Sequence, residues 1–327
     1  MEPSQPVKFK NFQDWHEFLQ AGQKTGLTPL QIRDLRFECY NKIEKLRKRP
    51  LLVYAANFLD SLPEGTPNSI EISDVDGFTD LVNSIPATET TVDVLLLSPG
   101  GRPDAAERIV SLLRRRFKEV HFLIPHSAYS AATMIALSGD SITLHPSATL
   151  GPIDPQIGGV PARSIKRGFQ NVKDHIKKEG AEALPPYIPL IEKYTLPLLE
   201  ICDDSEKLSK ELVKTWLKSY MFFGQKNAGK KVAQIVKYFS DYDKHLTHAR
   251  PISIEKLQKY KLTISYSENE LSELLWELHI MLMGFFNILG FVKLFENSHG
   301  VSWGKQIIVQ QIKAPVQAKP VTPTPKP

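Results

Sequence analysis

The chain has 327 residues, 42% of them hydrophobic and 24% charged, so it can bury a sizeable core and lies outside the composition of a disordered protein. The net charge of +5 is a mild basic excess that does not by itself indicate a nucleic-acid partner. The two cysteines, Cys39 and Cys202, form neither a CxxC pair nor a metal-like cluster. We therefore expect reduced thiols, no metal or other cofactor, and, with no apolar signal region near Met1, a cytoplasmic location.

Helices and strands alternate in the first half of the chain. Apolar residues at helical spacing follow Thr28 up to Pro50, which predicts an amphipathic helix within an N-terminal segment of residues 1–49. Helical patterns also separate the apolar runs that come next, so residues 50–165 are predicted to form an α/β core with a mainly parallel sheet. The runs that predict buried strands are Leu51–Phe58, Thr90–Ser98, Glu119–Pro125 and Ser141–Pro146.

Helical patterns dominate residues 166–312, which we expect to form a mainly helical extension that completes the domain. The last helical block is predicted over Asn269–Phe295. Its apolar part, Ile280–Phe295, is shorter than a membrane span and contains Lys293, so we expect a buried or oligomer-facing helix and no membrane span. The Pro-rich residues 313–327 predict a disordered tail.

The turn Ser98-Pro99-Gly100-Gly101 leaves the carboxyl end of a predicted strand and enters a helix. Two glycines at this point let backbone N–H groups face outward without a Cβ in the way. Such donors suit a carboxylate, a phosphate or the oxyanion of an acyl-transfer intermediate. The turn matches neither a P-loop nor GxGxxG, and taken alone it is equally compatible with a structural turn.

A second strand end runs into a helix start that is rich in Ser, Ala and Thr. A serine in the first turn of such a helix lies at the positive end of the helix dipole, beside free backbone N–H groups. Ser127, Ser130 and Ser138 are the candidates, and Ser130 is best placed because it heads the run AATMIAL. Each of them could instead be an N-cap or a small packing residue.

These two turns, followed by SGD and LGPIDPQIGG, resemble the ClpP/crotonase superfamily. The run SAATMIALSGDSITLHPSATLGPIDPQ is most similar to the serine dehydrogenase proteinase family, which is related to signal peptide peptidase A. The resemblance implies an α/β core of repeated ββα units wound into a spiral, a homo-oligomer, and serine peptidase chemistry. It also implies that Ser130 is the nucleophile, that Gly100 and Gly101 form the oxyanion-hole turn, and that the Ala131 N–H is the second donor.

The general base is the point at which the sequence departs from ClpP. ClpP has a histidine after the next strand, whereas this chain has LGPIDPQIGG there, with Asp154 closest to that position. A carboxylate can orient a base, or cap a turn, but with an ordinary pKa of about 4 it is a poor base for a hydroxyl. We predict His126 as the base because it lies just before Ser130 in sequence. The other candidates are Lys166, Lys173, His175 and His248.

Two functions fit these residues. The first is an ATP-independent serine peptidase that cleaves peptides or unfolded protein segments through an acyl-enzyme at Ser130. The second is a catalytically weak or inactive ClpP-fold scaffold that binds peptide or protein partners, which the missing aligned histidine favours. Acyl-thioester chemistry at the same oxyanion hole is a third option, although no pattern suited to coenzyme A is visible. We expect no nucleic-acid partner.

Overall fold

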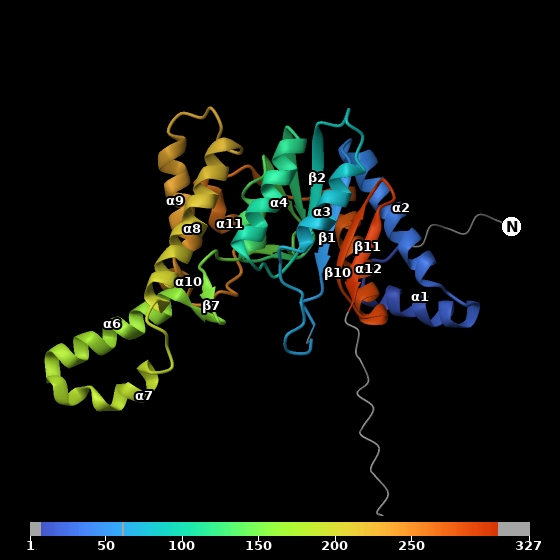
Figure 1. Cartoon of the computed structure of the whole chain (residues 1–327). Coiled ribbons are helices and arrows are strands. Elements are labelled where there is room, and N and C mark those ends of the chain that lie inside the picture. The colour runs from blue at the N-terminus through green and yellow to red at the C-terminus, as the bar shows by residue number, and fades with distance from the viewer. Residues whose placement is uncertain (1–7, 61, 307–327) are drawn as a thin grey trace, which may run out of the picture.

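The apolar runs of the sequence form a central, mostly parallel sheet (Figure 1). In the computed structural model, which describes residues 8–60 and 62–306, seven strands lie in the order β11-β10-β1-β2-β3-β5-β9. The strands from β1 to β9 run parallel, while β10 pairs antiparallel with β1 and β11 pairs antiparallel with β10. The strands are β1 Leu51–Ala56, β2 Thr91–Leu97, β3 Glu119–Ile124, β5 Ser141–Leu144, β9 Ile264–Tyr266, β10 Phe291–Asn297 and β11 Ser302–Gln306, and the short ones are β4 Ser127–Ala128, β6 Thr149–Leu150, β7 Gln156–Ile157 and β8 Val160–Pro161.

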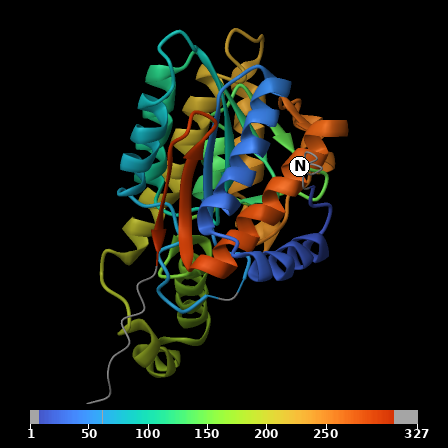
Figure 2. The ribbon, with the colours of Figure 1, turned by 90° about the vertical axis from the view of Figure 1, so that its right-hand side faces the viewer.

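Helices cover both faces of this sheet (Figure 2). Because side chains alternate along a strand, β1 sends Leu52 and Tyr54 into one core and Leu51 and Val53 into the other. The first core is closed by α3, α4 and α5 with α8 and α9 beyond them, and the second by α2 and α12 with α1 outside. The helices are α1 Phe12–Thr25, α2 Pro29–Arg47, α3 Asp74–Asn83, α4 Pro103–Arg116, α5 Ala131–Ala136, α6 Ala162–Glu179, α7 Ile188–Ile191, α8 Leu198–Ser219, α9 Ala228–Ser240, α10 Tyr242–His245, α11 Ile254–Leu257 and α12 Asn269–Leu289. This mixed α/β architecture is the predicted fold class.

The segment expected to be mainly helical does more than extend the domain. Helices α6 and α7 project away from the sheet, while α8 and α9 return to it (Figure 1). The same segment then supplies β9, β10 and β11, which complete both edges of the sheet. The predicted tail over residues 313–327 lies outside the described residues.

The predicted helix over Asn269–Phe295 is wrong at its end, because α12 stops at Leu289. Gly290 follows with a φ of 65°, a left-handed conformation that terminates helices and favours glycine, and Phe291 then begins β10. By length and composition α12 could cross a membrane, but 72% of its most apolar window is buried inside the fold. The apolar side chains of α12 pack against the sheet, α1 and α2, so they belong to the core.

Strand β10 carries a buried charged residue on each of its two faces. On the α2 face, Glu296 accepts two hydrogen bonds from the Arg36 guanidinium, at 2.8 and 2.6 Å, and another from the Tyr40 hydroxyl. Burial alone would lower the pKa of Arg36, but the hydrogen bonds and charge of Glu296 more than offset it and raise that pKa. On the opposite face, Lys293 pairs with Asp74.

We predict that Arg36→Met lowers the free energy of unfolding by about 3–5 kcal/mol, because it leaves the Glu296 carboxylate buried without its cation. Urea denaturation measures this change. The control is Arg33→Met, which removes a half-exposed pair with Asp34 and is expected to cost less than about 1 kcal/mol. Equal losses in the two variants would contradict the prediction.

Candidate active site

Two strand-to-helix turns meet at one edge of the sheet. The Ser98 N–H donates to the Ser127 carbonyl at 3.1 Å, and the Tyr129 N–H donates to the Ser98 carbonyl at 3.0 Å. A Cβ placed on Gly100 would lie 2.4 Å from the Tyr129 carbonyl oxygen and 2.6 Å from the Ser130 Cβ. The structure therefore brings Gly100 and Ser130 into backbone contact, and only glycine fits at position 100.

Ser130 has a strained backbone at the start of α5. Its φ of 52° and ψ of −123° lie in a region that residues with a side chain seldom adopt. Within residues 8–60 and 62–306 its hydroxyl has no hydrogen-bond partner. The other two candidate serines are buried and bonded: Ser127 contacts His126 and Tyr129, and Ser138 donates to the Ile135 carbonyl. Ser130 is thus the candidate whose hydroxyl is available to a ligand.

Two backbone N–H groups beside Ser130 are also available. Among the described residues, no acceptor is recorded for the N–H of Gly101 or for that of Ala131. The Gly100 N–H differs, because it donates to the Ser98 hydroxyl at 3.2 Å. The free donors are therefore those of Gly101 and Ala131, and Gly100 contributes mainly by having no Cβ.

A cavity of about 330 Å³ joins these groups. Its lining includes the apolar side chains of Met134 and Ile153 and the hydroxyls of Ser69 and Ser205. The full lining is Ser69, Pro99, Gly100, Gly101, Pro103, Ser130, Ala131, Met134, Ile153, Pro155, Gln156, Ser205, Ser209 and His248. Apart from His248, which can take up a proton, no lining side chain is ionisable.

His248 is held on this cavity by a buried carboxylate. Its Nδ1 lies 3.0 Å from Asp154 Oδ1, and the second carboxylate oxygen accepts from Gln156 Nε2 at 2.9 Å. Asp154 is 3% exposed, whereas the His248 side chain is 25% exposed. Two backbone hydrogen bonds between Leu150 and Ile252 join the loop that contains His248 to β6. The Nε2 of His248 has no partner in the described part of the chain.

The ring of His126 lies elsewhere. It stacks on His279 of α12 with ring centroids 4.7 Å apart, its Nδ1 contacts the Ser127 hydroxyl at 2.7 Å, and it does not line the cavity that holds Ser130. The structure thus places His248, which contacts Asp154, on the cavity that Ser130 lines, whereas His126 does not line it. The sequence favoured His126 for its nearness to Ser130, whereas His248, in a loop before Pro251, suggested a structural role; nothing in the sequence joins it to Asp154, 94 residues away.

The remaining base candidates lie on or near α6. Lys166 forms ion pairs with Asp203 and Glu206, and its hydrogen bond to Asp203 raises its pKa. A lysine held in its charged form is unsuited to accept a proton. Lys173 is exposed, and His175 Nδ1 contacts the Tyr187 hydroxyl at 2.8 Å.

The free energy of unfolding of alanine variants tests the close approach of Gly100 to Tyr129 and Ser130. We predict that Gly180→Ala costs about 1–2 kcal/mol, since the φ of 89° at Gly180 is strained for alanine although no atom lies within 4 Å of the added Cβ. Gly100→Ala, with a φ of 96°, is expected to cost a further 1–3 kcal/mol or so because its Cβ would also clash. Urea denaturation compares the two, and equal losses would mean that position 100 has room for a methyl group.

The buried imidazole of His279 gives the fold a dependence on pH. Burial, together with the charges of His126 and His145, lowers the pKa of His279 from 6.5 to about 3. Between these pH values the unfolded chain binds a proton that the folded chain does not, so stability falls as the pH falls. We predict that between pH 7 and pH 5 the wild type loses about 2 kcal/mol more than His279→Phe. Chemical denaturation at the two pH values measures this, and parallel losses would contradict it.

The chain is similar to several known proteins. A family model described as "ClpP-like SDH-type serine proteinase" matches residues 65–285. The uncharacterized protein MJ1495 of Methanocaldococcus jannaschii is 26% identical over 232 residues, which cover 70% of this chain and 71% of that protein. The uncharacterized protein MJ0137 of the same organism is 29% identical over 188 residues, or 58% of each chain. A solved structure, a mutant of the membrane-bound stomatin-specific protease 1510-N, has a TM-score of 0.39 at 19% identity and covers 64% of this chain and 79% of that one.

The α/β fold and the matching family model identify the chain as a ClpP-like protein. The family model spans more than half of the chain, so the chain belongs to the family of ClpP-like SDH-type serine proteinases. The family predicted from the sequence motifs is confirmed, and membership supports a hydrolase or peptidase function in general.

Proposed function

We propose that this protein is an ATP-independent serine peptidase that cleaves peptide bonds through an acyl-enzyme at Ser130. The observation that carries the proposal is a convergence on one cavity. Ser130, Gly101 and Ala131 line it, and the Ser130 hydroxyl and the other two residues' N–H groups have no partner in the described part of the chain. His248, which contacts Asp154, lines it as well.

In this mechanism His248 is the general base. Its Nε2 accepts the proton of the Ser130 hydroxyl while the oxygen attacks the peptide carbonyl, and it then donates that proton to the leaving amine. Asp154 accepts from Nδ1–H, which selects the tautomer with a free Nε2 and stabilises the imidazolium. The proposal therefore gives His248 the role of general base that the sequence analysis predicted for His126.

The oxyanion is stabilised by backbone donors. When Ser130 attacks, the carbonyl oxygen of the substrate gains negative charge, and the N–H groups of Gly101 and Ala131 donate to it. Collapse of the tetrahedral intermediate breaks the C–N bond and leaves an ester on Ser130. A water molecule, deprotonated by His248, then hydrolyses that ester.

The lining of the cavity suits an uncharged substrate side chain. Met134 and Ile153 supply apolar surface, and Ser69 and Ser205 supply neutral polar groups. A charged side chain would lose its hydration there without gaining a counter-charge. We therefore propose peptides or unfolded protein segments as substrates, cut beside an uncharged residue, and retain the expected cytoplasmic homo-oligomer as part of the proposal.

We predict that Ser130→Ala abolishes both labelling by a fluorophosphonate probe and hydrolysis of fluorescein-labelled casein. His248→Ala and Asp154→Asn are expected to lower kcat by about 10³- to 10⁴-fold, because the proton acceptor or its correct tautomer is lost. His126→Ala, the matched control, is expected to retain activity within about threefold, since its ring lies outside the cavity.

Other outcomes would select the alternatives. Labelling that persists in Ser130→Ala would remove Ser130 as the nucleophile. Loss of activity in His126→Ala but not in His248→Ala would return the role of base to His126. An unlabelled wild type that still binds peptide would indicate the scaffold, and a melting temperature raised by acyl-CoA would indicate thioester chemistry.

A further inference from the structure

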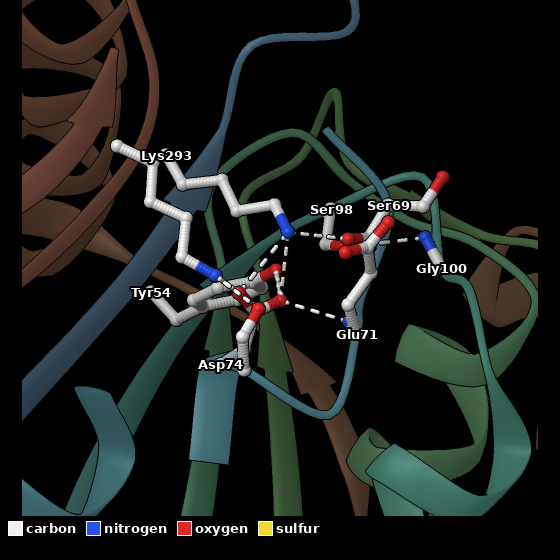
Figure 3. Close-up of polar contacts among 9 residues, drawn as sticks. Tyr54, Ser69, Glu71, Asp74, Ser98, Gly100 and Lys293 are labelled. Atoms are coloured by element: carbon white, nitrogen blue, oxygen red, sulfur yellow. Dashed lines mark hydrogen bonds and ion pairs between the residues drawn. The ribbon is translucent and has the colours of Figure 1, made fainter. Parts of the chain in front are cut away.

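Lys293 and Asp74 form a fully buried ion pair close to the Gly100–Gly101 turn (Figure 3). The Nζ of Lys293 lies 2.9 and 3.1 Å from the two carboxylate oxygens of Asp74, and both side chains are 0% exposed. Burial lowers the pKa of Lys293, and the hydrogen bond to Asp74 opposes that effect. Neither residue lines the cavity, so the mechanism above makes no use of this costly pair.

The pair holds a short stretch of backbone on both sides of Ile70. Lys293 Nζ donates to the carbonyl of Ser69, and the Glu71 N–H donates to Asp74 at 3.0 Å. The Tyr54 hydroxyl also donates to the Asp74 carboxylate, at 3.0 Å, and holds it in place. Figure 3 shows these groups converging on one segment from β10, α3 and β1.

Ile70 in turn holds the peptide that carries the Gly101 N–H. Its own N–H donates to the Gly100 carbonyl at 2.7 Å, and its carbonyl accepts from the Arg102 N–H at 2.9 Å. In a trans peptide the carbonyl of one residue and the N–H of the next point in opposite directions. Fixing the Gly100 carbonyl on Ile70 therefore fixes the direction in which the Gly101 N–H points, away from Ile70.

We propose that Lys293 and Asp74 are positioning residues that aim the Gly101 N–H at the oxyanion, by clamping Ile70 against the Gly100 carbonyl. This inference rests on the proposed function. Lys305 provides an internal comparison, because it contacts Asp74 at 2.6 Å and Ser73 at 2.7 Å but, among the described residues, not Ser69. From the Lys293 ammonium the path to Gly101 runs through the Ser69–Ile70 peptide and the Gly100 carbonyl, all of them backbone groups. A change at Lys293 therefore alters the transition state only by changing the direction of the Gly101 N–H.

The experiment measures kcat and KM separately on one internally quenched peptide that the wild type cleaves. Lys293→Met is expected to lower kcat about 100-fold, as for a misaligned catalytic group, with KM changed less than threefold. Two variants serve as controls. Arg36→Met breaks the buried pair on the other face of β10, and Lys305→Met removes the other lysine from Asp74; both are expected to keep kcat, per folded enzyme, within about threefold.

A double variant covers the case in which Lys293→Met does not fold. Lys293→Met with Asp74→Asn removes both charges of the pair and the contact of Lys293 with the Ser69 carbonyl, while the Asn side-chain oxygen can still accept from the Tyr54 hydroxyl and the Glu71 N–H. The same loss of kcat is expected in it. Unchanged kcat in whichever of the two variants folds, or an equal loss in Arg36→Met, would overturn the inference.

The assay also separates this inference from the function on which it rests. Ser130→Ala is measured beside the other variants. If it keeps the activity of the wild type, the proposed function fails, and the positioning role fails with it. If Ser130→Ala is inactive while the Lys293 variants retain kcat, the peptidase proposal stands and the positioning role alone is wrong.

Discussion

The contact between the Gly100 backbone and Ser130 is the constraint on which the site depends. Parallel strands end at the same edge of a sheet, so the turns that follow β2 and β3 are neighbours. They can approach this closely only because position 100 has no side chain. Their approach brings the Ser130 hydroxyl near two N–H groups, and none of the three has a partner among residues 8–60 and 62–306. Both turns line the cavity that His248 also lines.

Much of the fold could be predicted because its signals are local. Buried parallel strands appear in the sequence as apolar runs, and the turns between them contain proline, glycine and serine. The part that was missed has weak or misleading signals: β9 is only three residues long, and Phe291–Asn297 follows an apolar helix directly. Only Gly290 marks the change from helix to strand, and a single glycine does not show which structure comes after it.

The candidate site, like the fold, has one part that the sequence predicted and another that it did not. Ser130, Gly100 and Gly101 lie in turns whose composition made them candidates, and the structure brings these turns together. The partner of Asp154 could not be chosen from the sequence, since His248 is distant in the chain and is placed by the hydrogen bonds between Leu150 and Ile252. Nearness in sequence favoured His126, whose ring turns to the opposite side of the sheet, towards α12.

Strand β10, late in the sequence, pairs with β1, which lies near the start of the chain. It enters the sheet beside β1, although almost the whole α/β core precedes it in sequence. On one face it neutralises Arg36 from α2, and on the other it brings Lys293 to Asp74. During synthesis on the ribosome, Ser130 and the Gly100–Gly101 turn are made long before this strand. If Lys293 aims the N–H of Gly101 as proposed, that N–H is oriented only after β10 has emerged and taken its place beside β1.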